Sequence, residues 1–239
     1  MASLSKCGWS LLFNLQLGLY PVIDLHTHSI LSDGELIPSE LARRAEVAGY
    51  RVIAITDHGD HSNLDFIIPR LLNVCQKLQD AWAIRVIPGI ELTHIPPAYI
   101  YDLAVEARNH GAKIVVVHGE TIVEPVTAGT NMAALKSPID ILAHPGLITE
   151  EEAMMAAKNS ICLEITTRKG HSLTNGHVLS MARQSKAPLV LNTDSHTPHD
   201  LVSKEMARKI AIGAGMTEEE AEIMFHNSEE LVKKALKKK

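Results

Sequence analysis

The sequence contains little cysteine, and what it has is poorly placed for cross-linking. The three cysteines, Cys7, Cys75 and Cys162, are odd in number, widely separated and outside any C-x-x-C pattern. Disulfide-rich secreted domains and zinc ribbons need paired or closely spaced cysteines. We therefore predict reduced thiols and a cytoplasmic location.

The sequence also has no excess of positive charge. Its 28 acidic residues outnumber its 23 lysines and arginines, which gives a formal net charge of −5. Proteins that bind nucleic acid without sequence preference normally present a basic surface, so this balance argues against that class. An anionic substrate stays compatible with the charge, because bound dications would make one pocket locally positive.

No low-complexity tract, internal repeat or membrane-spanning apolar run is present in the sequence. The apolar stretch Gly8–Leu19 is too short to cross a bilayer, and no small-x-small cleavage site follows it. We interpret residues 1–20 as an N-terminal extension, a helix or strand closing one end of the domain, with a mis-assigned start codon as the alternative. Residues 21–239 show no linker or break in composition, and we predict that they form one domain ending in a helix and a basic tail.

Seven short apolar runs recur along the chain, with helical segments between them. Most are continuous and rich in β-branched residues or leucine, as parallel strands covered on both faces should be. The predicted strands are Val22–Leu25, Val52–Thr56, Arg85–Ile90, Lys113–Val117, Ile139–Ala143, Ile161–Ile165 and Pro188–Asn192. Capping boxes at Thr149–Glu152 and Thr217–Glu220 mark two helix starts. Because no glycine-rich phosphate loop follows the first run, this α/β pattern favours a closed seven-stranded barrel over an open nucleotide-binding sheet.

Histidine is plentiful, and its placement is more informative than its number. Of 13 histidines, six stand just past the carboxyl ends of five predicted strands. These six are His26, His28, His58, His118, His144 and His196. The carboxylates Glu91 and Asp194 end two strands in the same way. In a βα barrel all these ends meet at one mouth, where catalytic residues lie. A lone histidine at a strand end is more often a packed or surface residue, but this concentration indicates a metal centre.

The spacing within the strands supports the same interpretation. Side chains at positions i and i+2 of a strand point to the same side, so His26 and His28 can hold one ion together, and Asp194 and His196 form a second such pair. Imidazole and carboxylate ligands without thiolates suit Zn, Mn or Fe rather than Ca or an iron–sulfur cluster. The sequence thus predicts a centre of two or three divalent metal ions.

The strand-end residues belong to motifs that resemble those of a known family. The motifs are D-L-H-T-H-S-x-x-S-D-G (Asp24–Gly34), T-D-H (Thr56–His58), P-G-I-E (Pro88–Glu91), V-H-G (Val117–Gly119), A-H-P-G (Ala143–Gly146) and N-T-D-S-H (Asn192–His196). Together, and in this order, they resemble the PHP (polymerase and histidinol phosphatase) family over residues 22–196. The resemblance implies a single-domain, distorted (β/α)7 TIM-like barrel with a trinuclear metal centre that hydrolyses phosphate esters.

The resemblance also implies a role for each matched residue. The implied ligands are His26, His28, Glu91 and Asp194 for a first metal, Glu91, His118 and His144 for a second, and Asp33, His58 and His196 for a third. Asp33 stands where some members of the family have a histidine, an alternative that many members share. The rival barrel family, the amidohydrolases, commonly uses a bridging lysine on strand four. Here Lys113 lies at the opposite end of that strand, which disfavours amide or deaminase chemistry.

The predicted chemistry is hydrolysis without a covalent intermediate. Two cations bridged by Glu91 would lower the pKa of a shared water from about 15.7 toward about 7, and the metal-bridging hydroxide would attack phosphorus. The predicted catalytic residues are Glu91, Asp194 and His196. Arg168 and Lys169 are predicted to bind the substrate phosphate, against the alternative of a solvated loop pair. The long segment Gly119–Asn131 is predicted to face the substrate.

Four further histidines lie near the predicted mouth and are interpreted singly as polar loop residues, any of which could donate to a leaving group. They are His61, His94, His171 and His199.

Three classes of function stay open on the sequence. The favoured class is a phosphatase or phosphodiesterase acting on a small molecule, such as histidinol phosphate or a nucleotide, although histidinol phosphatases of this family usually have longer chains. The second is a 3′–5′ exonuclease or phosphodiesterase acting on nucleic acid, which the acidic charge disfavours. The third is a non-catalytic barrel subunit, which the full ligand set disfavours because buried, unpaired ligands are costly without metal. The sequence does not indicate the oligomeric state.

Overall fold

The computed structural model describes residues 22–237. The extension predicted over residues 1–20 and the very end of the basic tail lie outside the described residues. Within the described range, no helix combines the length and the apolar character that a membrane crossing requires.

Seven parallel strands make the wall of the barrel. They are β1 (Val22–Thr27), β2 (Tyr50–Ile55), β4 (Arg85–Leu92), β5 (Ile114–His118), β6 (Ile141–Ala143), β7 (Cys162–Thr166) and β8 (Leu189–Asn192), hydrogen-bonded in that order. Each overlaps one of the seven predicted runs, so the strand prediction is confirmed. The short strand β3 (His58–Gly59), which was not predicted, pairs with β4 and places His58 beside Glu91.

The first and last strands meet at their carboxyl ends. An isolated parallel bridge joins Thr27 to Ser195. The backbone N–H of His28 donates to the carbonyl of Ser195 at 2.8 Å, and that of Asp194 donates to the carbonyl of His26 at 2.9 Å. The barrel is therefore nearly closed, and the segments that close it also contain candidate metal ligands. This is the predicted distorted (β/α)7 TIM-like barrel in one domain.

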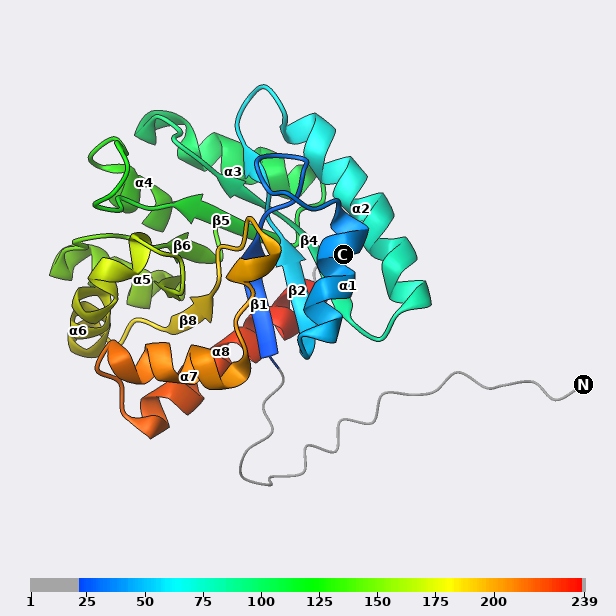
Figure 1. Cartoon of the computed structure of the whole chain (residues 1–239). Helices are drawn as coiled ribbons and strands as arrows, with labels where there is room; N and C mark the ends of the chain where they lie inside the picture. Colours follow the sequence, from blue (N-terminus) through cyan, green and yellow to red (C-terminus); the bar gives the residue numbers. More distant parts are fainter. Residues whose placement is uncertain (1–21, 238–239) are drawn as a thin grey trace, which may run out of the picture.

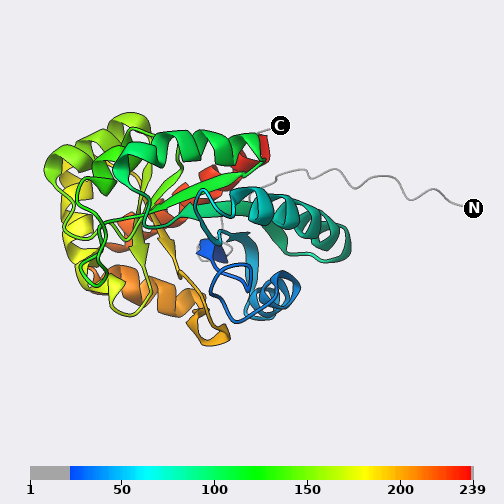
Figure 2. The same ribbon diagram turned by 90° about the horizontal axis from the view of Figure 1, so that it is seen from above.

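Helices surround the wall of strands (Figures 1 and 2). They are α1 (Pro38–Val47), α2 (Leu64–Ala81), α3 (Ile100–Asn109), α4 (Thr130–Leu135), α5 (Glu150–Asn159), α6 (Asn175–Ser185), α7 (Lys204–Gly213) and α8 (Glu218–Lys237), with short 3-10 turns η1 (Pro97–Tyr99), η2 (His171–Thr174) and η3 (Pro198–Asp200). Both predicted capping boxes are present. The N–H of Glu152 donates to Thr149 Oγ1 at 3.3 Å, and that of Glu220 donates to Thr217 Oγ1 at 3.2 Å.

The last helix has a different place from the others, because it closes the amino-terminal mouth of the barrel. It packs against β1 and β8 at the lower end of the barrel in Figure 1. Its Leu231, Val232 and Ala235 join one apolar cluster with inward-facing residues of the wall. The wall residues of that cluster are Leu25, Ala54, Ile87, Ile114, Val116, Ile141, Ala143, Cys162 and Val190. A second, larger apolar cluster fills the space between the strands and the outer helices. Apolar side chains of the described residues therefore fill the barrel toward its amino-terminal mouth, while the candidate ligands lie at its carboxyl-terminal mouth.

Candidate metal centre

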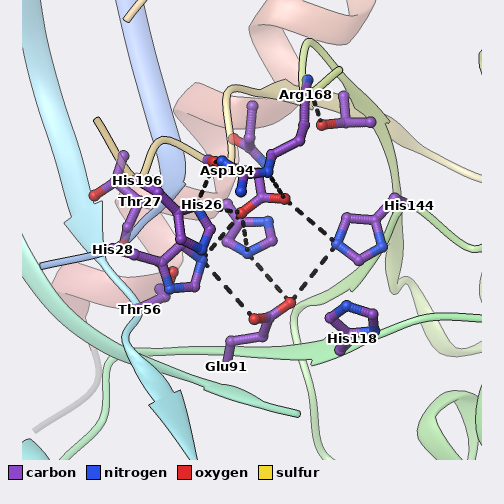
Figure 3. Close-up of polar contacts among 12 residues, drawn as sticks. His26, Thr27, His28, Thr56, Glu91, His118, His144, Arg168, Asp194 and His196 are labelled. Atoms are coloured by element: carbon purple, nitrogen blue, oxygen red, sulfur yellow. Dashed lines mark hydrogen bonds and ion pairs between the residues drawn. The ribbon is translucent and has the colours of Figure 1, made fainter. Parts of the chain in front are cut away.

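The carboxyl-terminal mouth collects the nine predicted metal ligands, and Figure 3 shows seven of them around a common space. They come from β1 and the turn after it (His26, His28, Asp33), from β3 (His58), β4 (Glu91) and β5 (His118), and from the turns after β6 (His144) and β8 (Asp194, His196). Because all strands run parallel, their carboxyl ends bring residues that are far apart in the sequence to one mouth.

Glu91 lies at the centre of this arrangement and is fully buried. Its Oε1 is 3.2 Å from His26 Nε2 and 3.9 Å from His144 Nε2. Its Oε2 is 2.7 Å from His58 Nδ1 and 3.8 Å from His28 Nε2. One carboxylate therefore faces four imidazoles, which come from β1 and the turn after it, from β3 and from the turn after β6.

Asp194 is the second central carboxylate. Its Oδ1 is 3.1 Å from His28 Nε2 and 3.7 Å from His26 Nε2, and its Oδ2 is 3.7 Å from His144 Nε2. Asp194 has a backbone φ of 53°, and His144 has one of 28°, both in the left-handed region that non-glycine residues rarely adopt. Such backbone strain is concentrated at functional sites, where the surrounding structure holds a side chain in a required direction.

A third group of ligands lies closer to solvent. Asp33 Oδ1 is 3.3 Å from His58 Nε2 and 3.2 Å from His196 Nε2. Ligand atoms of these three residues and of His28 all lie within 4.8 Å of one another. The three residues that the resemblance gives to a third metal are therefore placed together.

The buried atoms of the centre fit divalent cations better than they fit one another. His26 Nε2, both ring nitrogens of His28, Glu91 Oε1 and His144 Nδ1 are buried without a hydrogen-bond partner. Buried polar atoms are normally hydrogen-bonded, and leaving one unpaired costs about 1–3 kcal/mol. Several of the unpartnered nitrogens nevertheless lie 3.1–3.8 Å from a carboxylate oxygen without hydrogen-bond geometry. This is the arrangement expected of ligands that converge on a shared cation.

The electrostatics favour the metal-binding form of some of these side chains and the protonated form of others. Burial lowers the pKa of His28 to about 4, so its ring is neutral near pH 7. Burial also acts against charge on Glu91, but His26 and His58 hold the pKa of Glu91 well below its usual range. Metal ligands must be neutral imidazoles or ionised carboxylates. Without a cation, burial would lower the pKa of His26, yet Glu164, Glu91 and Asp194 raise it well above its usual value.

His118 lies beside His144 and also near a carboxylate of the loop after β5. Its ring meets that of His144 edge to face, with centroids 4.5 Å apart. Its Nε2, however, lies 3.2 Å from Oε2 of Glu124, a residue of the predicted substrate-facing loop. The close ligand groups that include Glu91 and His144 do not include His118 among the described residues.

Glu164, on β7, is a buried residue of the site that the sequence reasoning missed. Its Oε1 accepts from Asn192 Nδ2 at 2.8 Å and lies 2.9 Å from His26 Nδ1. Its Oε2 accepts from the backbone N–H of His144 at 3.2 Å. Glu164 thus fixes the ring of His26 so that Nε2 faces Glu91. The signal in the sequence was a single carboxylate within an otherwise apolar strand.

Two aspartates near the ligands accept hydrogen bonds from backbone N–H groups and hydroxyls rather than from an imidazole. Asp24 accepts from the hydroxyl of Thr193 and from the N–H of His26. Asp57 accepts from the N–H and the hydroxyl of Ser29 at 2.6 and 2.7 Å. Burial raises the pKa of Asp24 to about 7. These contacts fix the two turns from which the ligands of β1 and β8 project.

The two predicted substrate-binding residues lie in different environments. Arg168 is half-buried beside the centre, and its Nη1 donates to the carbonyl of Asp194 at 3.1 Å (Figure 3). Lys169 is exposed, and its predicted contact with substrate stays a prediction.

Among the four further histidines, His61 and His199 are exposed, while His171 is buried against His144, with ring centroids 4.2 Å apart. His94 lies beside His118 and Glu124.

Comparison with known proteins agrees with this geometry. The family model for the PHP domain matches residues 24–185. An uncharacterised protein of Methanocaldococcus jannaschii is 49% identical over 88% of this chain and 98% of its own length. Ribonuclease P protein component 3 of Methanosarcina mazei is 28% identical over 83% of this chain and 82% of its own length. A predicted phosphatase of Acetivibrio thermocellus is 26% identical over 73% of this chain and 79% of its own length.

Among solved structures, a predicted histidinol phosphatase of Listeria monocytogenes superposes with a TM-score of 0.56. The match covers 77% of this chain and 99% of that chain at 13% sequence identity. At this identity the likeness supports the barrel fold alone.

Proposed function

The chain belongs to the PHP domain family, and on that premise we propose that it hydrolyses a small-molecule phosphate ester at the carboxyl-terminal mouth of its barrel. Membership of the family makes it a metal-dependent hydrolase of phosphate esters. The proposal concerns the kind of substrate and the residues that act on it.

One observation supports the proposal most directly, which is the convergence of imidazoles on Glu91. Its two oxygens lie 3.2 Å from His26 and 2.7 Å from His58, from opposite sides of one carboxylate. A structural carboxylate is satisfied by one or two good hydrogen bonds, whereas Glu91 Oε1 has none. A bridging ligand is the role that this geometry fits.

The proposed ligands are the nine residues described above, and the proposed cations are two or three Zn, Mn or Fe ions. They are His26, His28, Asp33, His58, Glu91, His118, His144, Asp194 and His196. Bound divalent cations supply Lewis acidity, which lowers the pKa of bound water and neutralises charge on a phosphate. The ligand set contains no thiolate, which agrees with these metals.

The chain's own residues bind and orient the substrate. The proposed catalytic residues are Glu91, Asp194 and His196, which face the reacting phosphate from β4 and from the turn after β8. Arg168 donates one N–H to the carbonyl of Asp194, and its remaining N–H groups can bind anionic oxygens of the substrate. Lys169, one residue further on, would attract the same anion at longer range.

A cytoplasmic location is part of the proposal. Cys75 and Cys162 are both buried, free thiols. Such thiols are typical of proteins kept in a reducing compartment.

A second function has one specific observation in its favour, which is the similarity to ribonuclease P protein component 3. In that case the substrate would be RNA, and the same mouth would cleave or bind a phosphodiester chain. The net charge of −5 weighs against a broad nucleic-acid surface.

A substrate panel separates the two functions. Chelator-free protein supplied with Mn²⁺ should be assayed against phosphomonoesters, small phosphodiesters and end-labelled DNA and RNA oligonucleotides. We expect turnover of a small-molecule ester with little shortening of the oligonucleotides. Shortening of RNA without turnover of any small ester would replace the first function by the second, and inactivity on all substrates would reject both.

A further inference from the structure

A buried side chain from outside the ligand set joins the two turns that follow His118 and His144. Asn131 lies in the first turn of α4 and is 2% exposed. Its Oδ1 accepts from the backbone N–H of Glu120 at 2.9 Å, and its Nδ2 donates to the carbonyl of Pro145 at 2.9 Å. Glu120 is two residues after His118, and Pro145 directly follows His144. One amide group therefore spans the turn after β5 and the turn after β6.

The two contacts fix which way the amide of Asn131 points. A backbone N–H can only donate and a carbonyl can only accept, so Oδ1 must face Glu120 and Nδ2 must face Pro145. An aspartate at this position could still accept from Glu120. It would, however, turn a second acceptor oxygen toward the carbonyl of Pro145. Among side chains of this size, asparagine is therefore the one that satisfies both turns.

Asn131 is itself held against the turn after β5. Glu120 Oε1 accepts from the backbone N–H of Asn131 at 2.9 Å and from that of Gly129 at 3.0 Å. The backbone N–H of Glu120 and that of Asn131 thus each donate to the side chain of the other residue. This reciprocal pair fixes the base from which Nδ2 of Asn131 reaches the turn after β6.

The backbones of the two turns also touch directly. The N–H of Gly119 donates to the carbonyl of Ala143 at 3.0 Å. A Cβ atom at Gly119 would collide with that carbonyl, and a Cβ atom at Gly146 would collide with the carbonyl of Glu120. Glycine is the residue that allows so close an approach. A shift of one turn therefore displaces the other.

The backbone of His144 is the strained part of this contact. Its φ of 28° lies in the left-handed region, and such a conformation persists only where its surroundings hold it. The N–H of His144 donates to Glu164 Oε2 at 3.2 Å, and the carbonyl of the next residue, Pro145, accepts from Asn131. Glu164 and Asn131 thus hold the strained residue from its two sides, and the direction of its imidazole depends on both.

We propose that Asn131 is a positioning residue of the metal centre, which fixes His118 and His144 relative to each other by joining the turns that follow them. Backbone groups already occupy both ends of its amide, so it acts through the two histidines and not as a ligand. The inference rests on the proposed ligand set, in which these histidines and Glu91 hold one ion. It does not depend on the nature of the substrate.

The test compares Asn131→Asp with a matched control. Asn131→Asp keeps the size of the side chain and the acceptor for Glu120, and it removes the donor to Pro145. The control is Asn227→Asp, because Asn227 of α8 donates from Nδ2 to the carbonyl of Leu189 at 2.8 Å, at the opposite end of β8 from the ligands. Each chelator-stripped protein is titrated with Zn²⁺ alone, and bound zinc is counted after dialysis. Urea denaturation and hydrogen exchange are measured on the metal-free proteins.

We expect one zinc equivalent of Asn131→Asp to bind about 10–100-fold more weakly than in the wild-type protein, as is typical when a group that orients a ligand is changed. The other zinc equivalents and all those of Asn227→Asp should keep the wild-type affinity. Hydrogen exchange of residues 144–148 should be faster in Asn131→Asp, while the N–H of Glu120 stays protected. Both variants lose one amide-to-carbonyl hydrogen bond, so a similar loss in the free energy of unfolding is expected and would not explain a selective loss of zinc.

Three results would overturn the role of Asn131. They are unchanged zinc affinity in Asn131→Asp, equal weakening of every zinc equivalent, and a wild-type protein that binds no zinc. The substrate panel is run on the same proteins. Turnover of a small ester together with unchanged zinc affinity would reject the role of Asn131 and leave the proposed function standing. A selective loss of one zinc in a protein inactive on every small ester would support that role and reject the proposed function.

Discussion

The two mouths of the barrel are built from the same seven strands, but the side chains at one mouth stabilise the folded protein and the unpaired polar atoms at the other destabilise it. At the amino-terminal mouth, Leu231, Val232 and Ala235 of α8 pack on inward-facing apolar residues of the wall. At the carboxyl-terminal mouth, buried nitrogens and oxygens of the histidines and of Glu91 have no hydrogen-bond partner. Burying apolar surface stabilises a fold by about 25 cal/mol per Å², whereas an unpaired buried polar atom costs about 1–3 kcal/mol.

Stability and activity therefore depend on opposite ends of the same strands. The apolar plug, formed by Leu231, Val232 and Ala235 of α8 at the amino-terminal mouth, stabilises the fold without metal. The ligand layer, which is the set of nine candidate ligands at the carboxyl-terminal mouth, destabilises the fold on its own and stabilises it when cations bind, because ligand binding to the folded state adds to its stability. Substitutions at the carboxyl-terminal mouth should therefore affect catalysis, and substitutions at the amino-terminal mouth should affect the free energy of unfolding. The four predictions below test this division in order of expected effect.

The largest effect is expected at Glu91. Glu91→Gln keeps the size of the side chain and removes the charge that faces four imidazoles. Hydrolysis of the best substrate from the panel should fall by about 10³-fold or more, which corresponds to at least about 4 kcal/mol. The far-UV circular dichroism spectrum should stay that of the wild-type protein. Wild-type turnover in this variant would refute the central role of Glu91.

The opposite mouth gives the next largest effect. Leu231→Ala removes a buried side chain, 6% exposed, from the plug. It should lower the free energy of unfolding by about 2–4 kcal/mol, measured by urea denaturation of chelator-treated protein. The turnover number at saturating metal should stay within about twofold of wild type at a temperature where the variant is folded. A large loss of turnover there would show that the two mouths are not independent.

A substitution of Glu164 tests whether its contact with His26 contributes to metal binding. Glu164→Gln weakens the contact that fixes His26 while leaving every proposed ligand in place. Metal affinity should fall by about 10–100-fold, as is typical when the partner of a ligating histidine is changed. Activity should recover at higher metal concentration, which the Glu91→Gln variant should not do. Failure to recover would mean that Glu164 acts on more than the position of His26.

The sequence was sufficient to predict the strands of the wall and the gathering of the candidate ligands at one mouth, and the reason is local. Strand residues are recognised by their own apolar pattern, and parallel strands bring their ends together whatever lies between them. The sequence was not sufficient to predict features that depend on contacts between residues far apart in the chain. Helix α2 contains Pro69, a residue that usually interrupts a helix, and was not predicted. Glu164 is hidden inside an apolar run, and Glu124 reaches His118 only through the course of a loop.

The same distinction applies to α8. Its start was predicted because Thr217 and Glu220 form a capping box, which is a local pattern. Its position under the barrel was not, because the apolar face of α8 fits any apolar surface and only the whole fold decides which one.

The smallest effect is expected at the start of α8. Thr217→Ala removes the hydroxyl that accepts from the N–H of Glu220 at 3.2 Å. The carboxylate of Glu220 still binds Arg183 of α6 through two N–H groups at 2.7 Å each, so part of the helix start stays fixed. We expect a loss of about 0.5–1 kcal/mol in the free energy of unfolding, at the low end for such caps.

The same substitution at another helix start shows whether the effect of Thr217→Ala is specific to α8. Thr149→Ala breaks the corresponding capping box at the start of α5, on the outer wall, where Thr149 Oγ1 accepts from Glu152 N at 3.3 Å. If the barrel unfolds as one unit, both variants should lose similar free energy by urea denaturation, and neither should change zinc affinity. A change of zinc affinity in Thr217→Ala alone would mean that the plug helix adjusts the ligand layer through the barrel interior, and the separation of the two mouths would have to be abandoned.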